Sequence, residues 1–234
     1  MFVSSSAFSA EYGSHWGYSG ESGPENWAKL TGDNFACTGK NQSPINLTGF
    51  IESELTPLVF NYNAGGNEII NNGHTVQINY QKGSSFNVDN TEFNLLQFHF
   101  HAPSENNING HSFPLEAHLV HADKDGNLAV VAVMFKEGAE NKGLAAAWNK
   151  LPMHEGDKNK FAENVVASDI LPANKDYYRF NGSLTTPPCS EGVRWFVMKD
   201  VVSASIEQIE AFKHTMHGPN NRPLQSVNAR VILQ

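Results

Sequence analysis

The stretch that decides the fold is FNLLQFHFHA, residues 93–102. Apolar and polar side chains alternate along it, and a period of two is typical of a β-strand with one buried face. In such a strand Gln97, His99 and His101 project from one face, and both phenylalanines that separate them project from the other. The pattern predicts two imidazoles on one side. Such a pair alone is weak evidence for a metal site, because half-solvated strands often alternate polar and aromatic residues.

A second predicted strand, LEAHLVHA at residues 115–122, supplies a third imidazole. Alternation places Glu116 and His118 on one face, whereas His121 points to the other and is interpreted as a structural histidine. Antiparallel pairing would bring His118 beside the first two imidazoles. Three neutral imidazoles leave one tetrahedral position open, as catalytic Zn²⁺ requires, and ligands without sulfur keep the ion a strong Lewis acid. The predicted zinc ligands are His99, His101 and His118.

Two polar residues share strand faces with these histidines. Gln97 and Glu116 could each accept a hydrogen bond from a ligand imidazole, which would fix the tautomer and the orientation of the ring. Ordinary polarity of a strand surface is the alternative. Their position beside the ligands favours the first interpretation.

Other alternating segments surround the two strands, at residues 68–71, 75–80 and 128–136. Short connections that contain Gly or Asn favour antiparallel neighbours. Helical periodicity is confined to residues 141–151 and to a stretch after Ser205, where Ser205 and Gln208 predict a capping box. The sequence therefore predicts a mainly β (α+β) protein with short peripheral helices.

The chain shows no repeat or Pro-rich linker, so we expect one domain over residues 1–234, preceded by a loosely ordered segment at 1–14. A formal net charge of -8 argues against a nucleic-acid partner, which would recruit a basic surface. The apolar runs are far shorter than a membrane span needs. The Ser-rich start after Met1 resembles a mature N-terminus, from which we expect a signal peptide to have been removed.

Cys37 and Cys189 are the only cysteines, and neither belongs to a CxxC or Cys-His metal pattern. Buried free thiols are expected for an intracellular protein, whereas a long-range disulfide would indicate a periplasmic or extracellular location. Composition alone leaves both alternatives open.

Seven motifs, spread in order from about Trp16 to the C-terminus, together resemble the signature of the alpha-class carbonic anhydrases. The three most specific carry the histidines and a Thr-Thr-Pro-Pro loop. The motifs are HWGY (15–18), QSPIN (42–46), NGH (72–74), QFHFH (97–101), EAHLVH (116–121), GSLTTPP (182–188) and NRP (221–223).

The resemblance implies a large, twisted, mostly antiparallel central β-sheet with peripheral short helices. It also implies the reversible hydration of CO2 to bicarbonate and a proton by zinc-bound hydroxide, with a side esterase activity. Glu105 and Thr185 match the family's orienting pair. Because an ionised glutamate can only accept hydrogen bonds, the Thr185 hydroxyl must donate to it. His74 matches the proton-shuttle histidine.

Further roles follow from the resemblance position by position. Three residues match the network that holds the waters of the proton path, and Gln77 among them stands where many relatives carry Asn; the three are Tyr18, Asn72 and Gln77. The expected substrate-binding residues combine two threonines with an apolar wall suited to CO2: Thr185, Thr186, Val120, Val130, Leu184, Val193 and Trp195.

Several secreted and bacterial relatives join two cysteines at the positions of Cys37 and Cys189. The resemblance therefore predicts this disulfide and a periplasmic or secreted protein, and it also suggests a homodimer. Two rival functions are a non-enzymatic binding module, which arises in this fold when a zinc histidine is lost, and a general zinc hydrolase. All three histidines are present here, and no peptide-binding feature accompanies the small apolar pocket.

Overall fold

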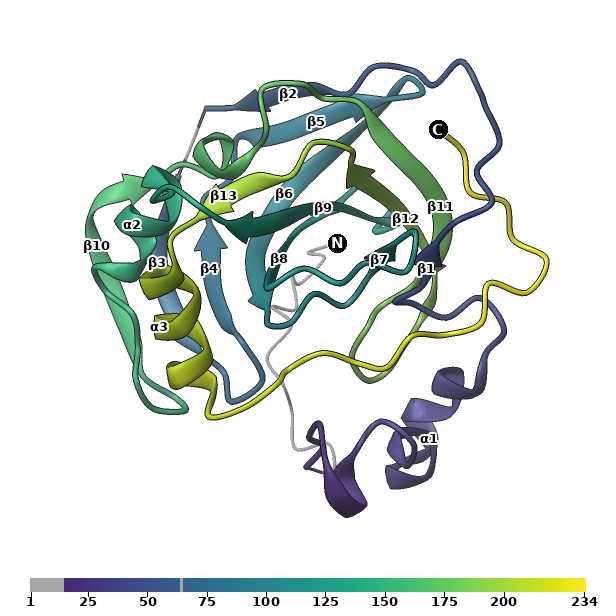
Figure 1. Ribbon diagram of the computed structural model, residues 1–234, viewed down its shortest axis with the longest axis horizontal. Coiled ribbons are helices and arrows are strands. Elements are labelled where there is room, and N and C mark those ends of the chain that lie inside the picture. The colour runs from purple at the N-terminus through teal and green to yellow at the C-terminus, as the bar shows by residue number, and fades with distance from the viewer. Residues whose placement is uncertain (1–14, 64) are drawn as a thin grey trace, which may run out of the picture.

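The computed structural model describes residues 15–63 and 65–234. The predicted loosely ordered segment at 1–14 lies outside the described residues. Within them, eleven strands form one mixed, mostly antiparallel sheet with few, short helices, as predicted (Figure 1). Its strands are β2 (Val59–Tyr62), β3 (Gly66–Asn71), β4 (Val76–Tyr80), β5 (Ser84–Val88), β6 (Thr91–His101), β8 (Leu115–Ala122), β9 (Leu128–Glu137), β10 (Lys158–Val165), β11 (Tyr177–Ser183), β12 (Glu191–Met198) and β13 (Val202–Ala204).

The main path of the sheet runs β10-β3-β4-β6-β8-β9-β12-β11, and β1 (Asn46–Leu47) pairs separately with β7 (Asn107–Ile108). The strands predicted from alternation are the consecutive neighbours β3, β4, β6, β8 and β9, all antiparallel. Strand β9 pairs in parallel with β12 and β13. The register sets His99 directly opposite His118 across β6 and β8, and Gln77 opposite His99 across β4 and β6. Strand pairing thus builds the site from residues far apart in sequence.

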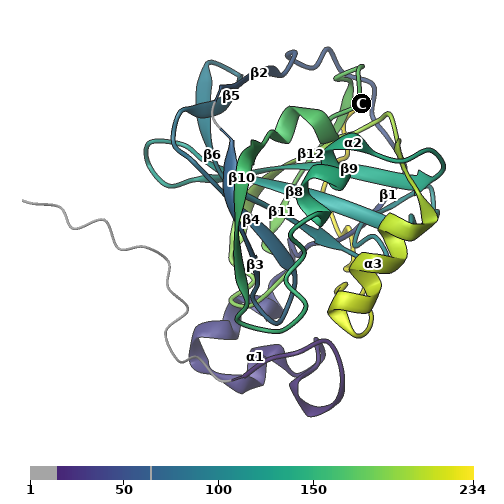
Figure 2. The same cartoon turned by 90° about the vertical axis from the view of Figure 1, so that its left-hand side faces the viewer.

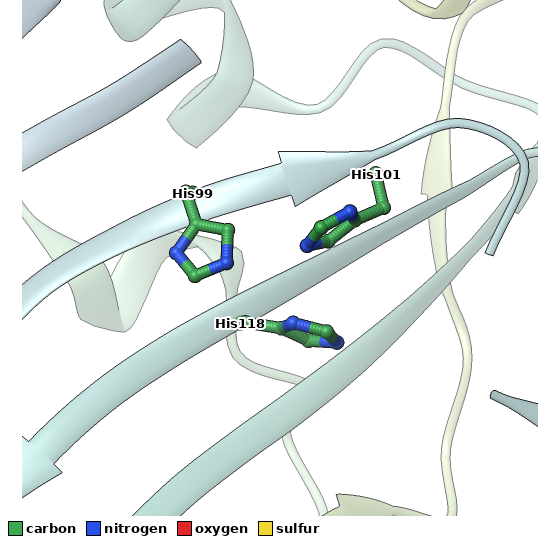
Figure 3. Close-up of side chains that lie close together, drawn as sticks. All are labelled: His99, His101 and His118. Carbon is green, nitrogen blue, oxygen red and sulfur yellow. The ribbon is translucent and has the colours of Figure 1, made fainter. Parts of the chain in front are cut away.

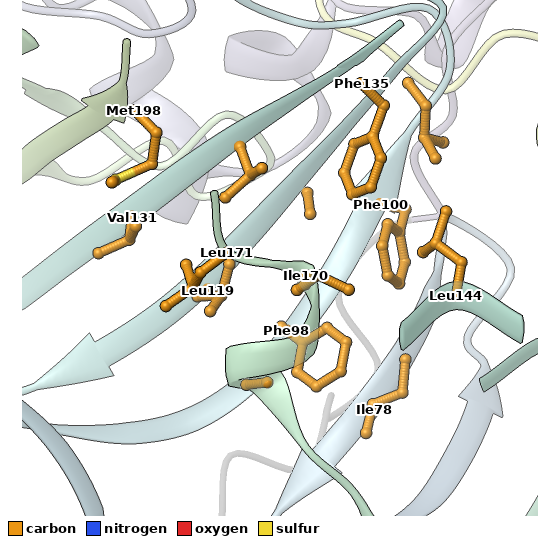
Figure 4. Close-up of a cluster of buried hydrophobic side chains, with 14 of the residues drawn as sticks. Ile78, Phe98, Phe100, Leu119, Val131, Phe135, Leu144, Ile170, Leu171 and Met198 are labelled. Carbon is orange, nitrogen blue, oxygen red and sulfur yellow. The ribbon is translucent and has the colours of Figure 1, made fainter. Parts of the chain in front are cut away.

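The pleat of the central strands sends alternate side chains into two separate cores. Phe98 and Phe100 enter the larger core together with Leu144 of α2 (Lys142–Trp148) (Figure 4). Phe212 of α3 (Ile206–Met216) belongs to the same core. The histidine face carries the second core, which includes Trp195. Phe98 and Phe100 therefore anchor β6 on the side opposite the site.

Helices α2 and α3 begin where a side chain accepts a hydrogen bond from one of their first backbone N–H groups. Ser205 and Gln208 form the predicted capping box of α3, and the side chain of Asn141 accepts from the N–H of Leu144 at the start of α2. Helix α1 (Trp27–Leu30) lies at the lower end of the sheet, away from α2 and α3 (Figures 1 and 2). In the described part of the chain, every helix is too short or too polar to cross a bilayer.

Candidate active site

His99 and His101 of β6 and His118 of β8 converge on one point (Figure 3). One ring nitrogen from each lies within 4.8 Å of the other two. His101 and His118 are each 1% exposed, and His99 is half-buried. Adjacent antiparallel strands hold the three rings, so their relative positions depend on backbone hydrogen bonds and not on flexible loops.

In two of these rings, a hydrogen bond that the ring donates to a neighbour on its own strand decides which nitrogen faces the centre. Nδ1 of His99 lies 2.8 Å from Oε1 of Gln97, and Nε2 of His118 lies 2.9 Å from Oε1 of Glu116. Each oxygen accepts, so each of these nitrogens carries the ring hydrogen. Nε2 of His99 and Nδ1 of His118 are left with free lone pairs for a metal.

The third ring is oriented by a backbone carbonyl that the sequence analysis did not identify. Nδ1 of His101 donates to the backbone carbonyl oxygen of Asn220 at 2.7 Å, and the side-chain Oδ1 of Asn220 accepts from the N–H of Ala102 at 2.8 Å. Asn220 directly precedes the NRP motif at 221–223, which was its only signal in the sequence. The buried Nε2 of His101 has no hydrogen-bond partner among residues 15–63 and 65–234.

The environment keeps all three imidazoles neutral. Burial lowers the pKa of His99 and of His118 well below the usual range, and neighbouring imidazoles lower both further. Burial also lowers the pKa of His101, although the Asn220 carbonyl and Glu116 oppose it. Three neutral nitrogen donors, one of them an orphaned buried atom, fit a catalytic zinc ion with an open position. The predicted three-histidine zinc site is confirmed.

Glu116 is fully buried and is held by three donors besides its histidine. Its oxygens accept from the N–H groups of Glu105 and Asn106 at 2.7 and 2.9 Å, and from the Asn106 side chain at 2.8 Å. Burial raises the pKa of Glu116 to about 7, and the hydrogen bonds from Asn106 oppose that rise. The carboxylate links the ligand strand to the loop that carries Glu105.

Glu105 is 1% exposed and lies beside the ligands, with Oε2 3.5 Å from Nε2 of His101. Its Oε1 accepts from the backbone N–H of Arg222 at 2.8 Å. Burial raises the pKa of Glu105 well above its usual range, while the N–H of Arg222 and the hydroxyl of Thr185 oppose the rise by donating hydrogen bonds. The structure thus brings Glu105 and Thr185 together across 80 residues of sequence, next to the histidines.

A disulfide between Cys37 and Cys189 fastens the loop that contains Thr185 and Thr186. Neither cysteine is free, so the disulfide expected from the resemblance is confirmed and the free-thiol alternative is wrong. The N–H of Cys189 donates to the carbonyl of Thr186 at 2.8 Å, and the amide of Gln42 donates to the carbonyl of Cys189 at 3.1 Å. The loop is therefore tied to the N-terminal part of the domain.

The apolar residues expected to bind CO2 lie together on the histidine face of the sheet. Four of them are buried in the second core and Leu184 packs against that core while partly exposed. The ring of Trp195 meets the ring of His118 edge-on, with centroids 4.9 Å apart. The four buried members are Val120, Val130, Val193 and Trp195.

A small cavity of about 120 Å³ is lined in part by His99 and His101. Its lining includes Thr186 and all the residues expected to form the proton path. Those residues are Tyr18, Asn72, His74 and Gln77. The hydroxyl of Tyr18 is buried without a hydrogen-bond partner in the described part of the chain, and burial, with the nearby charge of Glu105, raises its pKa well above the usual range.

His74 is half-buried and is one of the residues that line this cavity. Its ring stacks on Trp16, with centroids 3.6 Å apart and planes 10° apart, and its backbone N–H donates to Oδ1 of Asn72 at 3.0 Å. Burial lowers the pKa of His74. The carboxylate of Glu155 opposes this shift, whereas the nearby His15 adds to it. Trp16 was seen in the sequence only as part of a motif, and the stacking partner was not predicted.

Outside the cluster, His121 is fully buried on the opposite face, as its alternation predicted. Its Nε2 lies 2.8 Å from the hydroxyl of Tyr62, and its ring packs edge-on against Phe86. Burial lowers the pKa of His121 to about 3. It is a neutral histidine of the core and contributes no metal ligand.

Comparison with known proteins agrees with this geometry. The family model for eukaryotic-type carbonic anhydrases matches residues 22–234. The chain is 50% identical to a carbonic anhydrase of Pectobacterium atrosepticum over 94% of its length and 90% of that protein, and 44% identical to one of Neisseria gonorrhoeae over 100% and 94%. An alpha-carbonic anhydrase from Thermovibrio ammonificans superposes with a TM-score of 0.94 at 46% identity, covering 95% of this chain and all of that one. With its three-histidine zinc site and this sheet, the chain belongs to the eukaryotic-type, or alpha-class, carbonic anhydrases, enzymes that reversibly hydrate CO2.

Proposed function

We propose that three parts of the site divide the work of CO2 hydration: a metal centre, an orienting pair and a proton path. The orienting pair is Glu105 with Thr185, and the proton path ends at His74. The observation that carries the proposal is the convergence of three neutral ring nitrogens within 4.8 Å of one another beside a buried apolar cluster. The metal centre consists of His99, His101 and His118.

When bound, zinc supplies a Lewis acid that lets water ionise near neutrality, and its charge favours the ionised form of Glu105. The ionised carboxylate accepts the hydroxyl hydrogen of Thr185, which leaves the threonine lone pairs to accept from the attacking nucleophile. This fixed direction orients the attack. We assign to the backbone N–H of Thr185 the role of donating a hydrogen bond to a substrate oxygen. Thr186, which lines the cavity, is assigned to substrate binding as well.

The second core provides the binding surface for CO2 itself. An apolar substrate gains little from hydrogen bonds, and a buried apolar wall beside His118 holds it without competing for the polar groups. Val120 and His118 leave the same face of β8, so the wall and the metal centre share one strand. Gln97 and Glu116 keep the ligand rings in the orientation that this arrangement requires.

Proton export needs a shuttle if turnover is to be fast. A group that titrates near neutrality releases its proton directly to water at about 10³ per second at most, because recombination is limited by diffusion. His74 is supported as that shuttle by its place in the cavity lining, beside the zinc ligands His99 and His101. Tyr18, Asn72 and Gln77 line the same cavity and are assigned to the water path.

Replacing His74 with alanine is expected to lower kcat in weak buffer about tenfold or more, since the proton then leaves without a general base. Added imidazole should restore most of the rate. Stopped-flow CO2 hydration in weak buffer measures both effects, with His111→Ala as a control at an exposed histidine outside the cavity. An unchanged kcat in the His74 variant would remove it from the path.

We further propose a periplasmic or secreted location. The Cys37–Cys189 disulfide supports it, because such bonds persist in oxidising compartments. Fractionation of cells of the source organism tests the location.

The family resemblance also suggests a homodimer, which stays a prediction that analytical ultracentrifugation can test. One domain over residues 1–234 likewise stays a prediction. Ester hydrolysis is proposed as a side activity of the same site.

The function is tested by stopped-flow CO2 hydration before and after removal of metal with a chelator, followed by readdition of zinc. We expect hydration to disappear with the metal and to return with it. A binding module would show no hydration in any state. A general zinc hydrolase would cleave esters in a metal-dependent way while CO2 hydration stayed at the background rate.

A further inference from the structure

A row of polar side chains crosses the sheet from its outer strands to the cavity, on the same face as the histidines. Glu68 of β3 lies opposite Asn79 of β4, and Gln77 precedes Asn79 on that face. Nδ2 of Asn79 donates to Oε1 of Glu68 at 2.9 Å, and Nε2 of Gln77 donates to Oδ1 of Asn79 at 2.6 Å. All three side chains are half-buried. Gln77 ends the row in the lining of the cavity.

The charge at the far end of this row determines the direction of both amides. An ionised carboxylate has no hydrogen to donate, so Asn79 must present its NH2 group to Glu68. The carbonyl oxygen of Asn79 then faces Gln77 and can only accept, so Gln77 must present its own NH2 group to it. The carbonyl oxygen of Gln77 is consequently the end that remains for the cavity. Reversing either amide would set two acceptors against each other.

We propose that Glu68 is a positioning residue for proton export, which acts through Asn79 to hold Gln77 as a hydrogen-bond acceptor at the cavity. This inference rests on the proposed role of His74. A water that donates one hydrogen to the Gln77 carbonyl has its other hydrogen available for His74, and its lone pairs can receive a proton from the inner side. A reversed Gln77 would donate to that water and use a lone pair that the incoming proton needs.

The register explains why these residues can reach across two strands to the site. Asn79 lies opposite Gln97 on β6, and Gln77 lies opposite the zinc ligand His99. The row therefore ends one strand away from the ligand itself, in a position to order the water path without contacting the metal. Gln77 stands where many relatives carry Asn, and its longer side chain reaches Asn79 on its own strand.

Neutron diffraction of the zinc-loaded enzyme tests the amide orientation without reference to activity. We expect deuterium on the Gln77 nitrogen that faces Asn79 and on the Asn79 nitrogen that faces Glu68. Deuterium on a Gln77 nitrogen that faces the cavity would overturn the proposal. This readout stands even if His74→Ala leaves turnover unchanged, so failure of the shuttle assignment and failure of the positioning role are distinguishable.

The second test reverses and then restores the polarity of the row. Glu68→Gln keeps the shape of the side chain but can donate, so both amides can turn; kcat in weak buffer should fall about threefold while kcat/KM stays unchanged. Adding Asn79→Asp restores an acceptor-only group, now in the middle of the row. The new glutamine amide donates to it, Gln77 again donates to it, and kcat should recover.

Glu163→Gln on the neighbouring β10 is the matched control, because it removes one negative charge at an exposed position outside the row. Its kcat should equal that of the unmodified enzyme. A Glu68→Gln variant with unchanged kcat would overturn the proposal, and so would a double variant that stays as slow as the single one. A parallel fall in kcat/KM would point instead to a general structural role and would equally overturn it.

Discussion

The His118→Ala variant is expected to lose its zinc and its CO2 hydration activity together. The substitution removes Nδ1, one of three nitrogen donors that lie within 4.8 Å of one another, and leaves two donors on β6. Two imidazoles hold zinc far more weakly than three in a preformed site. We expect the rate constant for hydration to fall by at least about a thousandfold, because no activated nucleophile forms without the metal.

Metal analysis by mass spectrometry after dialysis, run beside stopped-flow hydration, measures both losses. His214→Ala is a suitable control, since that histidine is exposed on α3 and outside the cluster. The His118 side chain is buried, so circular dichroism must show that the variant is folded. A folded His118 variant with one bound zinc per chain would refute the ligand assignment.

Reduction of the Cys37–Cys189 disulfide is expected to produce the second large effect, on stability. The bond joins residues 152 positions apart, and the entropy of closing such a loop corresponds to an upper value of about 5 kcal/mol in the free energy of unfolding. For a chain of this size the unfolding temperature should fall by about 10–20 °C. Scanning calorimetry with and without a thiol reductant measures the change.

The control is the double variant Cys37→Ser with Cys189→Ser, whose unfolding temperature should be low and insensitive to reductant. Because Cys189 also donates to the Thr186 carbonyl, the loop next to Thr185 should loosen as well, and hydration by the reduced protein should fall. An unfolding temperature that reduction leaves unchanged would contradict the argument from loop entropy.

Period-two alternation was sufficient to predict the strands that carry the ligands. Residues 93–102 and 115–122 became β6 and β8, and both phenylalanines of the QFHFH motif lie opposite the histidines because the pleat admits no other arrangement. Alternation is less clear in β12, where both faces are largely buried, and in the edge strand β10, where most residues are exposed; neither was predicted.

The rest of the site depends on contacts between distant segments. Local reasoning gave the three histidines, but Glu105, Thr185 and His74 came only from the family resemblance, since nothing in their neighbouring residues marks them. The Asn220 carbonyl that orients His101 was missed because every residue has a carbonyl, and only the folded chain decides which one meets an imidazole. The row from Glu68 to Gln77 was missed for the same reason.

X-ray absorption at the zinc edge of the loaded enzyme tests the central claim most directly, because it counts the atoms around the metal. The account predicts three imidazole nitrogens at about 2.0–2.1 Å and a fourth position open to solvent. A fourth protein donor, or fewer than three imidazoles, would contradict it, since the site could then not supply an activated nucleophile to CO2.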